Sequence, residues 1–252
     1  MICPMSLGVM SNTPSVILVA PQMGENIGAA ARVMGNFGLS DLRIVAPRDG
    51  WPNPAAETMS AGAFEAGVVS PMIFDTLEEA ISDLSLVLAT TARQRGMEKP
   101  VFTTAPAVDR LKTHTGKSGV LFGAEKSGLP NEAVALCDAI LTYPVNNAFA
   151  SLNLAQAVGV FAHAWAAADT PAIPEGVDQP APREELVGMM QHFENELDRA
   201  GFFFPEAKKP VMIQNLRNAF TRSGWTSQET RTFRGAIKAL ALGRGKARID
   251  RD

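Results

Sequence analysis

A glycine, a carboxylate and two small polar side chains follow two apolar runs in the middle of the chain. Gly123 and Glu125 come directly after Val120-Leu121-Phe122, and Ser151 and Asn153 follow the next apolar run. Glycine lets the backbone approach a ligand closely, and free amides at a helix start receive an anionic or carbonyl group. Open α/β sheets bind ligands just past the carboxyl ends of their strands. The pattern therefore predicts a ligand site at that edge of a sheet.

Each of these polar residues also has a simpler interpretation. Ser151 could only cap the helix that follows it, Asn153 could be a solvated residue of the first turn, and Glu125 could be an ordinary turn carboxylate. Their order and spacing, taken together, favour the functional interpretation.

Apolar runs alternate with helical periods through the first two thirds of the chain. This alternation predicts an α/β fold, with a mainly parallel sheet and helices on both of its faces. We expect Asn26 and Ser151 to cap the helices that follow them. The expected strands are 15–20, 42–46, 72–74, 86–89, 120–122 and 139–145, and the expected helices are 27–37, 55–64, 77–84, 105–112 and one that ends near 168.

The last third of the chain has a different organisation. Residues 169–182 are rich in Pro, Ala and acidic residues and form the best candidate linker. Three helical patterns follow, at 183–200, 211–221 and 227–242. We therefore expect a first domain over 1–168 and a small all-helical extension over 183–252.

Positive charge is concentrated in this extension. The segment from Lys208 to Asp252 contains eleven Lys and Arg and three acidic residues, a net charge of +8. The net charge of the whole chain is −3, so residues 1–207 carry −11. A basic tail on an acidic body fits a phosphate-binding appendage, although a merely solvated helical face is the simpler alternative. The cations that we expect to bind phosphate are Arg217, Arg222, Arg231 and Arg234 of the tail, with Arg93 and Arg95 of the loop after 86–89.

Composition excludes several other classes of protein. Nearly half of the 252 residues are apolar, which suffices for a large core, and no apolar run is long enough to span a membrane. The first ten residues lack the basic residues of a signal peptide, so we expect a cytoplasmic protein. Cys3 and Cys137 cannot make a disulfide framework or a zinc site, and the three histidines are scattered, so no metal is expected.

Three motifs, in order, resemble those of the SpoU branch of the SPOUT RNA methyltransferases. They are Asn26-Ile27-Gly28-Ala29-Ala30-Ala31-Arg32, Phe122 to Leu129, and Ser151 to Ala157. Three ordered motifs are far more specific than a single Gly-rich loop. The resemblance implies a deep trefoil knot, S-adenosylmethionine as the cofactor, RNA as the partner of the arginines, and a homodimer with pocket residues from both subunits.

The resemblance also implies roles for particular residues. It assigns binding of the target nucleotide and catalysis to Arg32, Asn26, Glu125, Ser151 and Asn153. It assigns cofactor binding to Thr90, Thr91, Ala92, Gly123, Tyr143, Ser151 and Leu152. Two features depart from the family: Tyr143 stands where an aliphatic residue is frequent, and Asn146 to Ala150 replaces the usual Asn-Pro-Glu-Tyr.

The helical tail resembles the TrmJ subgroup of tRNA methyltransferases through Asn215-Leu216-Arg217 and Glu229 to Gly235. This implies 2′-O-methylation of the pyrimidine at position 32 of the tRNA anticodon loop. The alternatives are methylation of another tRNA site or of ribosomal RNA, and a catalytically silent RNA-binding homologue. A generic nucleotide-binding protein is disfavoured because neither a Gly-x-Gly-x-x-Gly fingerprint nor a P-loop lysine follows any strand.

Overall fold

The computed structural model describes residues 13–91, 99–146, 148–168, 180–222 and 224–243. Within these ranges, the centre of the fold is a seven-stranded sheet with the order β3-β2-β1-β6-β4-β7-β5, in which every pair is parallel. The strands are β1 (Ser15–Val19), β2 (Asp41–Val45), β3 (Ser70–Phe74), β4 (Leu86–Thr90), β5 (Val101–Phe102), β6 (Ser118–Phe122) and β7 (Ala139–Leu141).

The predicted parallel sheet is confirmed, with two differences in its strands. Strand β5 was not predicted, because two residues are too short to form a recognisable apolar run. Strand β7 ends at Leu141 rather than at residue 145. The chain leaves the sheet after this strand, and Tyr143 and Val145 line a cavity.

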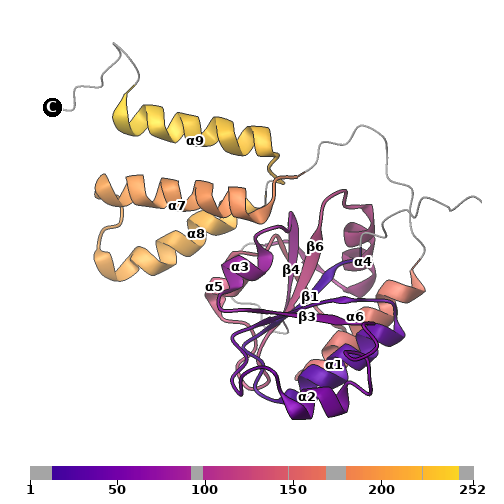
Figure 1. Cartoon of the computed structure of the whole chain (residues 1–252). Helices are drawn as coiled ribbons and strands as arrows, with labels where there is room; N and C mark the ends of the chain where they lie inside the picture. The colour runs from indigo at the N-terminus through magenta and orange to yellow at the C-terminus, as the bar shows by residue number, and fades with distance from the viewer. Residues whose placement is uncertain (1–12, 92–98, 147, 169–179, 223, 244–252) are drawn as a thin grey trace, which may run out of the picture.

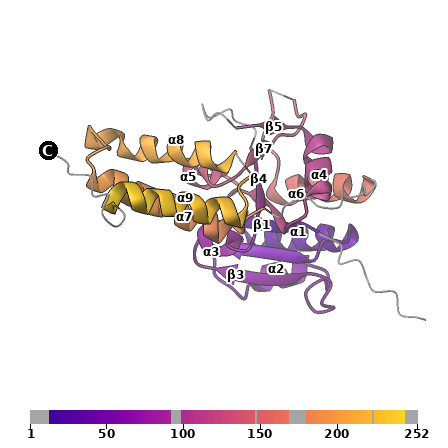
Figure 2. The same ribbon diagram turned by 90° about the horizontal axis from the view of Figure 1, so that it is seen from above.

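Helices cover both faces of the sheet, as predicted, and three more form the C-terminal region (Figures 1 and 2). In the part of the chain that the structure describes they are α1 (Gly24–Asn36), α2 (Pro54–Met59), α3 (Leu77–Ile81), α4 (Thr104–Thr113), α5 (Asn131–Ala135), α6 (Leu154–Ala167), α7 (Arg183–Arg199), the 3-10 turn η1 (Glu206–Lys208), α8 (Lys209–Thr221) and α9 (Ser227–Leu242).

Alternate residues of the inner strand β1 belong to two separate cores. Val16 and Leu18 pack with residues of α1, α4 and α6 on one face, whereas Ile17 packs with residues of α3, α5 and α7 on the other. In the sheet, Ile17 pairs with Arg43 of β2 and Leu121 of β6. Burial on both faces explains why the strands read as uninterrupted apolar runs.

Small residues let the helices pack closely. A Cβ on Gly28 of α1 would lie 2.2 Å from the carbonyl oxygen of Ala56 in α2, so only glycine fits there. The first motif lies on α1 and the third runs into α6, and these two helices pack along each other.

The helical C-terminal region is attached to the sheet through buried polar contacts as well as apolar ones. The Arg183 side chain, fully buried at the start of α7, pairs with the Asp138 carboxylate. Asp138 also accepts the backbone N–H of Val87 in β4, at 2.7 Å. The buried Lys99 ammonium donates to the hydroxyl of Thr221 in α8, at 2.8 Å. These contacts hold α7 and α8 in a defined place against the sheet.

The all-helical character predicted for the C-terminal region is confirmed over residues 183–242. Its interior is aromatic: Phe193, Phe220, Trp225 and Phe233 meet at centroid distances of 5.3–6.1 Å. The domain boundaries and the trefoil knot stay predictions. Among the described residues, no helix combines the length and apolar character needed to cross a membrane.

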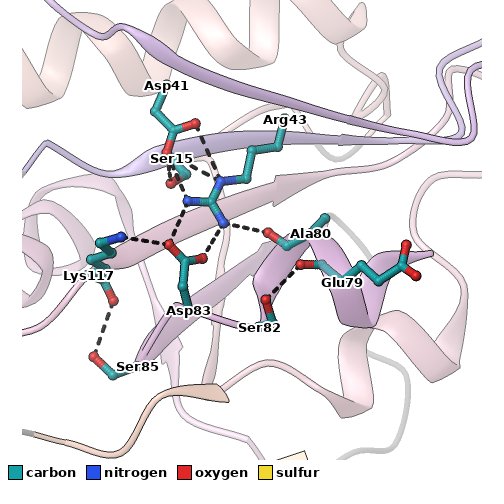
Figure 3. Close-up of polar contacts among 9 residues, drawn as sticks. All are labelled: Ser15, Asp41, Arg43, Glu79, Ala80, Ser82, Asp83, Ser85 and Lys117. Atoms are coloured by element: carbon teal, nitrogen blue, oxygen red, sulfur yellow. Dashed lines mark hydrogen bonds and ion pairs between the residues drawn. The ribbon is translucent and has the colours of Figure 1, made fainter. Parts of the chain in front are cut away.

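A charged network joins the amino ends of β1 and β2 to the segments that precede β4 and β6 (Figure 3). Arg43, in β2, is buried between two carboxylates, with N···O distances of 3.0 Å to Asp41 and 2.5 Å to Asp83. The Ser15 hydroxyl of β1 donates to Asp41, and the ammonium of Lys117, next to β6, donates to Asp83 at 2.9 Å.

This network changes the titration of Asp83. Burial alone would raise the pKa of the Asp83 carboxyl, but hydrogen bonds from Arg43 and Lys117 outweigh it and lower the pKa from 3.8 to about 2. The ionised carboxylate therefore stabilises the fold above about pH 4, and this contribution is lost as the pH falls toward the folded-state pKa.

Asp83→Asn should lower the free energy of unfolding by about 1 kcal/mol at neutral pH, since the carboxylate is partly exposed and its ion pairs are partly screened. The difference from the wild type should shrink as the pH falls toward about 2. Urea unfolding at a series of pH values measures both effects. Asp49→Asn, which removes an exposed pair with Arg48, is the control and should change stability little. A difference for Asp83→Asn that stays constant with pH would contradict this account.

Candidate active site

A cavity of about 340 Å³ opens at the carboxyl ends of β4 and β6, beside the start of α6. It lies where sheets of this kind bind ligands. All of the described residues that were predicted to bind the cofactor line it, namely Thr90, Thr91, Gly123, Tyr143, Ser151 and Leu152. Ala92, the remaining predicted cofactor residue, lies outside the described residues.

One wall of the cavity is the loop after β6, which folds back on itself. A Cβ on Gly123 would lie 2.1 Å from the carbonyl carbon of Gly128, so the backbone closes only because residue 123 is glycine. The Gly128 N–H donates to the carbonyl of Ala124 at 2.8 Å, and Gly128 has a φ of +67°. The glycines of this motif therefore shape the loop that presents Glu125 and Lys126 to the cavity.

Two further side chains of the wall are fixed by hydrogen bonds to main-chain carbonyls. The Thr90 hydroxyl donates to Leu121 at 2.7 Å, and the Tyr143 hydroxyl donates to Ala157 of α6 at 2.8 Å. Burial raises the pKa of the Tyr143 phenol, which therefore stays neutral and keeps its proton for this bond. Tyr143 thus ties the segment after β7 to α6 and presents its ring to the cavity.

A hydrogen-bonded chain of three side chains joins the three motifs. The Asn26 amide donates to the Glu125 carboxylate at 2.6 Å, and the Asn153 amide donates to the Asn26 side-chain oxygen at 2.8 Å. The second Glu125 oxygen accepts the backbone N–H of Gln22 at 2.8 Å. Glu125 therefore acts as an acceptor that positions Asn26.

Two helix caps differ from prediction. Asn153, not Ser151, caps α6, with its side-chain oxygen accepting the N–H groups of Ala155 and Gln156 at 2.9 and 3.3 Å. Helix α6 begins at Leu154, so Ser151 lies too far upstream to reach its free amides. Asn26 is not a cap either: α1 begins at Gly24, which places Asn26 in the buried first turn, where its side chain bonds Glu125.

The motifs that build this site match a known family. Residues 14–163 match the model of the SpoU rRNA methylase family. The chain belongs to this family. Residues 184–251 match the model of the tRNA methyltransferase TrmJ C-terminal domain, so both parts of the resemblance are confirmed.

Individual relatives are similar to this protein over almost its whole length. The tRNA (cytidine/uridine-2′-O-)-methyltransferase TrmJ of Klebsiella pneumoniae is 33% identical over 236 residues, 89% of this chain and 95% of that protein. The tRNA (cytidine/uridine/adenosine-2′-O-)-methyltransferase TrmJ of Pseudomonas aeruginosa is 33% identical over 237 residues, which are 88% of this chain and 91% of that protein. The crystal structure of TrmJ from Z. mobilis ZM4 superposes with a TM-score of 0.85 at 47% identity, covering 90% of this chain and 99% of that one.

The motif-one arginine of this SpoU-family chain stands apart from the network. Arg32 lies on the exposed side of α1, and it makes no hydrogen bond or ion pair with any described residue. It is six residues beyond Asn26, which is about 9 Å along a helix axis. No carboxylate of the described residues pairs with Arg32, and Glu125 accepts from Asn26 instead.

The arginines predicted to bind RNA have different surroundings. Arg217 is largely buried and forms a two-bond ion pair with Glu194, at 2.8 and 3.0 Å, so it is directed into the helical region rather than toward solvent. Arg231 and Arg234 are exposed on α9, and Arg231 is 4.0 Å from the Glu185 carboxylate. Arg222 is also exposed. Arg93 and Arg95 lie outside the described residues.

Sequence reasoning missed two contributors to the site. Gln22 supplies a backbone N–H to Glu125, and backbone donors leave no trace in residue type. Lys126 lines the cavity and is exposed. Its position inside the Gly-rich loop next to Glu125 was the available signal.

Gly123→Ala should destabilise the protein by about 1–3 kcal/mol, because the added methyl group would meet main-chain atoms that cannot move aside. Equilibrium unfolding in urea measures this loss. Gly235→Ala on the exposed face of α9 is the matched control, since nothing lies within 4 Å of the added Cβ and alanine favours a helix by about 0.5–1 kcal/mol. Equal stability of Gly123→Ala and the wild type would refute the close approach in the loop.

Proposed function

We propose that this chain is an S-adenosylmethionine-dependent methyltransferase that acts on a ribose 2′-hydroxyl of tRNA. One observation carries the proposal: the residues predicted to bind the cofactor line one cavity, and the Asn26–Glu125–Asn153 network stands beside it. Relatives that are 33–47% identical over about nine tenths of the chain support the tRNA assignment.

The cavity fits the proposed cofactor in size and chemistry. Its walls combine an aromatic ring, small aliphatic side chains and main-chain groups, which suit an adenine and a ribose. When bound, S-adenosylmethionine supplies a methyl group on a sulfonium centre. The residues that would hold it are Thr90, Thr91, Gly123, Tyr143, Ser151 and Leu152.

The side of the network that faces solvent suits the acceptor nucleotide. Asn153 is exposed, and its amide nitrogen has two hydrogens, of which one bonds Asn26. The second hydrogen can donate to the ribose or its phosphate. Glu125 is already occupied by Gln22 and Asn26, so it positions the site and is not assigned the proton of the 2′-hydroxyl.

Arg32 is proposed to hold the target phosphate and to stabilise the alkoxide that develops on the ribose. A guanidinium stays protonated and presents several donors to an anion. The proton of the hydroxyl would then pass to phosphate or water. Because Arg32 is exposed and unpaired among the described residues, its cationic group is available to an RNA ligand.

The basic helical region supports tRNA as the substrate, and the proposed target is the pyrimidine at position 32 of the anticodon loop. Exposed Arg222, Arg231 and Arg234 would contact the RNA backbone. We also propose a cytoplasmic homodimer in which both subunits contribute to the site. The competing functions are 2′-O-methylation of another tRNA site or of ribosomal RNA, and silent RNA binding.

Methyl transfer from labelled S-adenosylmethionine to bulk tRNA that lacks the modification tests the proposal directly. Nucleoside digestion should yield a 2′-O-methylated pyrimidine that maps to the anticodon loop. Label in ribosomal RNA alone would keep the chemistry and reject the substrate. Absence of label from both RNAs, with S-adenosylmethionine still bound, would identify a silent RNA-binding protein.

Arg32→Lys should reduce methyl transfer by about a hundredfold or more, because an ammonium cannot reproduce the planar, multiple donors of a guanidinium. Equilibrium titration with S-adenosylmethionine should give an unchanged Kd, since Arg32 does not line the cavity. Arg199→Lys, which alters an exposed cation of α7, should retain wild-type activity. Near-normal rates in Arg32→Lys would rule out the role proposed for Arg32.

A further inference from the structure

We infer that Phe149 is the residue on which the base of the target nucleotide stacks when its ribose enters the site. This inference rests on the proposed function and assigns the substrate contact of a loop that departs from the family pattern. It concerns a positioning residue for the acceptor, and it leaves the chemistry of methyl transfer unchanged.

The first observation is the exposure of the ring. Phe149 is 79% exposed, although it belongs to the segment that links β7 to the functional helix α6. An aromatic ring in water forgoes the stabilisation that burial would provide. Among the described residues its ring pairs with no other aromatic ring, and it belongs to neither hydrophobic core.

The second observation is where the loop holds the ring. Val145 before it and Ala150 and Ser151 after it all line the cavity. The Phe149 N–H donates to the carbonyl of Asn146 at 2.9 Å, which closes a turn in the loop. Phe149 thus lies in a turn between residues that line the cavity, on the chain segment that leads directly to Asn153.

Geometry then favours a base as the occupant. The acceptor ribose must bring its 2′-oxygen to the cavity beside Asn153, so the base attached to that ribose has to lie at the rim. A base presents a flat π-face whatever its identity, and aromatic side chains are the usual platforms for unstacked bases. Stacking on Phe149 would hold a nucleotide of an RNA loop without demanding a particular base.

The surroundings of Phe149 disfavour a protein as the occupant. Its described neighbours in the loop are Asn146, Ala148, Ala150 and Ser151, which are polar or small. A stable protein interface needs a contiguous, largely apolar core of several hundred Å² on each partner. A single ring among small polar residues is suited to one flat ligand.

The exposed ring of Phe204 provides a matched control. It is 84% exposed, and it lies in the turn between α7 and α8, far along the chain from the cavity. Replacing either phenylalanine with leucine removes aromaticity and keeps apolar bulk. Any effect specific to Phe149→Leu therefore reports on its position at the site.

The test uses the full-length protein with an unmodified tRNA transcript. Phe149→Leu should raise the KM for tRNA, lowering kcat/KM by about tenfold or more, the size of one stacking contact. The Kd for S-adenosylmethionine and the molecular mass in solution should not change. Phe149→Tyr and Phe149→Trp, which keep a stacking face, should restore kcat/KM to near the wild-type value, and Phe204→Leu should behave as wild type.

A binding measurement separates stacking from turnover. A fluorescent pyrimidine analogue is placed at the methylated position of the transcript, and its emission is followed on titration with each protein in the presence of S-adenosylhomocysteine. Phe149→Trp, whose indole quenches a base stacked on it, should lower the emission at saturating protein, and Phe149→Leu should not lower it.

Two outcomes would overturn the inference while leaving the proposed function intact. The first is a wild-type kcat/KM in Phe149→Leu together with an emission that Phe149→Trp does not lower. The second is dissociation of a dimer in Phe149→Leu, which would assign the ring to a contact between copies of the chain. If the wild type itself transfers no methyl group to tRNA, the proposed function fails first, and the inference fails with it.

Discussion

The site depends on one carboxylate with two fixed donors. Glu125 accepts the Asn26 amide with one oxygen and the Gln22 N–H with the other, and Asn26 in turn accepts from Asn153. These bonds tie together the loop after β6, the start of α1 and the start of α6. A carboxylate suits this place because it accepts only, and its hydrogen bonds are stronger than those of a neutral group. Without this carboxylate, the hydrogen bonds that connect the loop after β6 to the start of α1 would be lost.

The stabilising charged network and the cavity lie at opposite ends of the strands. At the amino ends of the strands, Arg43 and its carboxylates cross-link β1, β2 and the segments before β4 and β6 (Figure 3). At the carboxyl ends, the loops diverge and leave a cavity. A parallel sheet makes this division natural, since all strands present their carboxyl ends to the same side. The rigid edge allows the loops of the other edge to be shaped for a ligand.

The helical region shows why a charge count does not measure free charge. The tail is strongly basic in sequence, yet Arg217 is paired within the fold with Glu194. Arg183, which precedes the tail, is likewise paired with Asp138. Buried pairs of this kind cost much to break once formed, because one ion would remain unpaired. The Arg183–Asp138 pair holds α7 against the sheet, and the Arg217–Glu194 pair joins α8 to α7. Helix α9, which carries exposed cations, packs along α7 (Figures 1 and 2). The phosphate contacts proposed for the tail therefore come from a smaller set of arginines than the sequence suggested.

The sequence by itself determined the α/β class, six of the seven strands of the described residues, the order of the motifs and the composition of the cavity wall. Those features follow from local periodicity and from glycines whose role is set by their neighbours. Only the tertiary structure decided which side chains are hydrogen-bond partners. Asn26 meets Glu125 across 99 residues and Asn153 across 127, and no local pattern encodes such pairings. It also moved the α6 cap from Ser151 to Asn153 and left Arg32 and Phe149 exposed. The physical reason is that periodicity records which face of an element is buried, whereas hydrogen-bond partners depend on how loops meet after the sheet has formed.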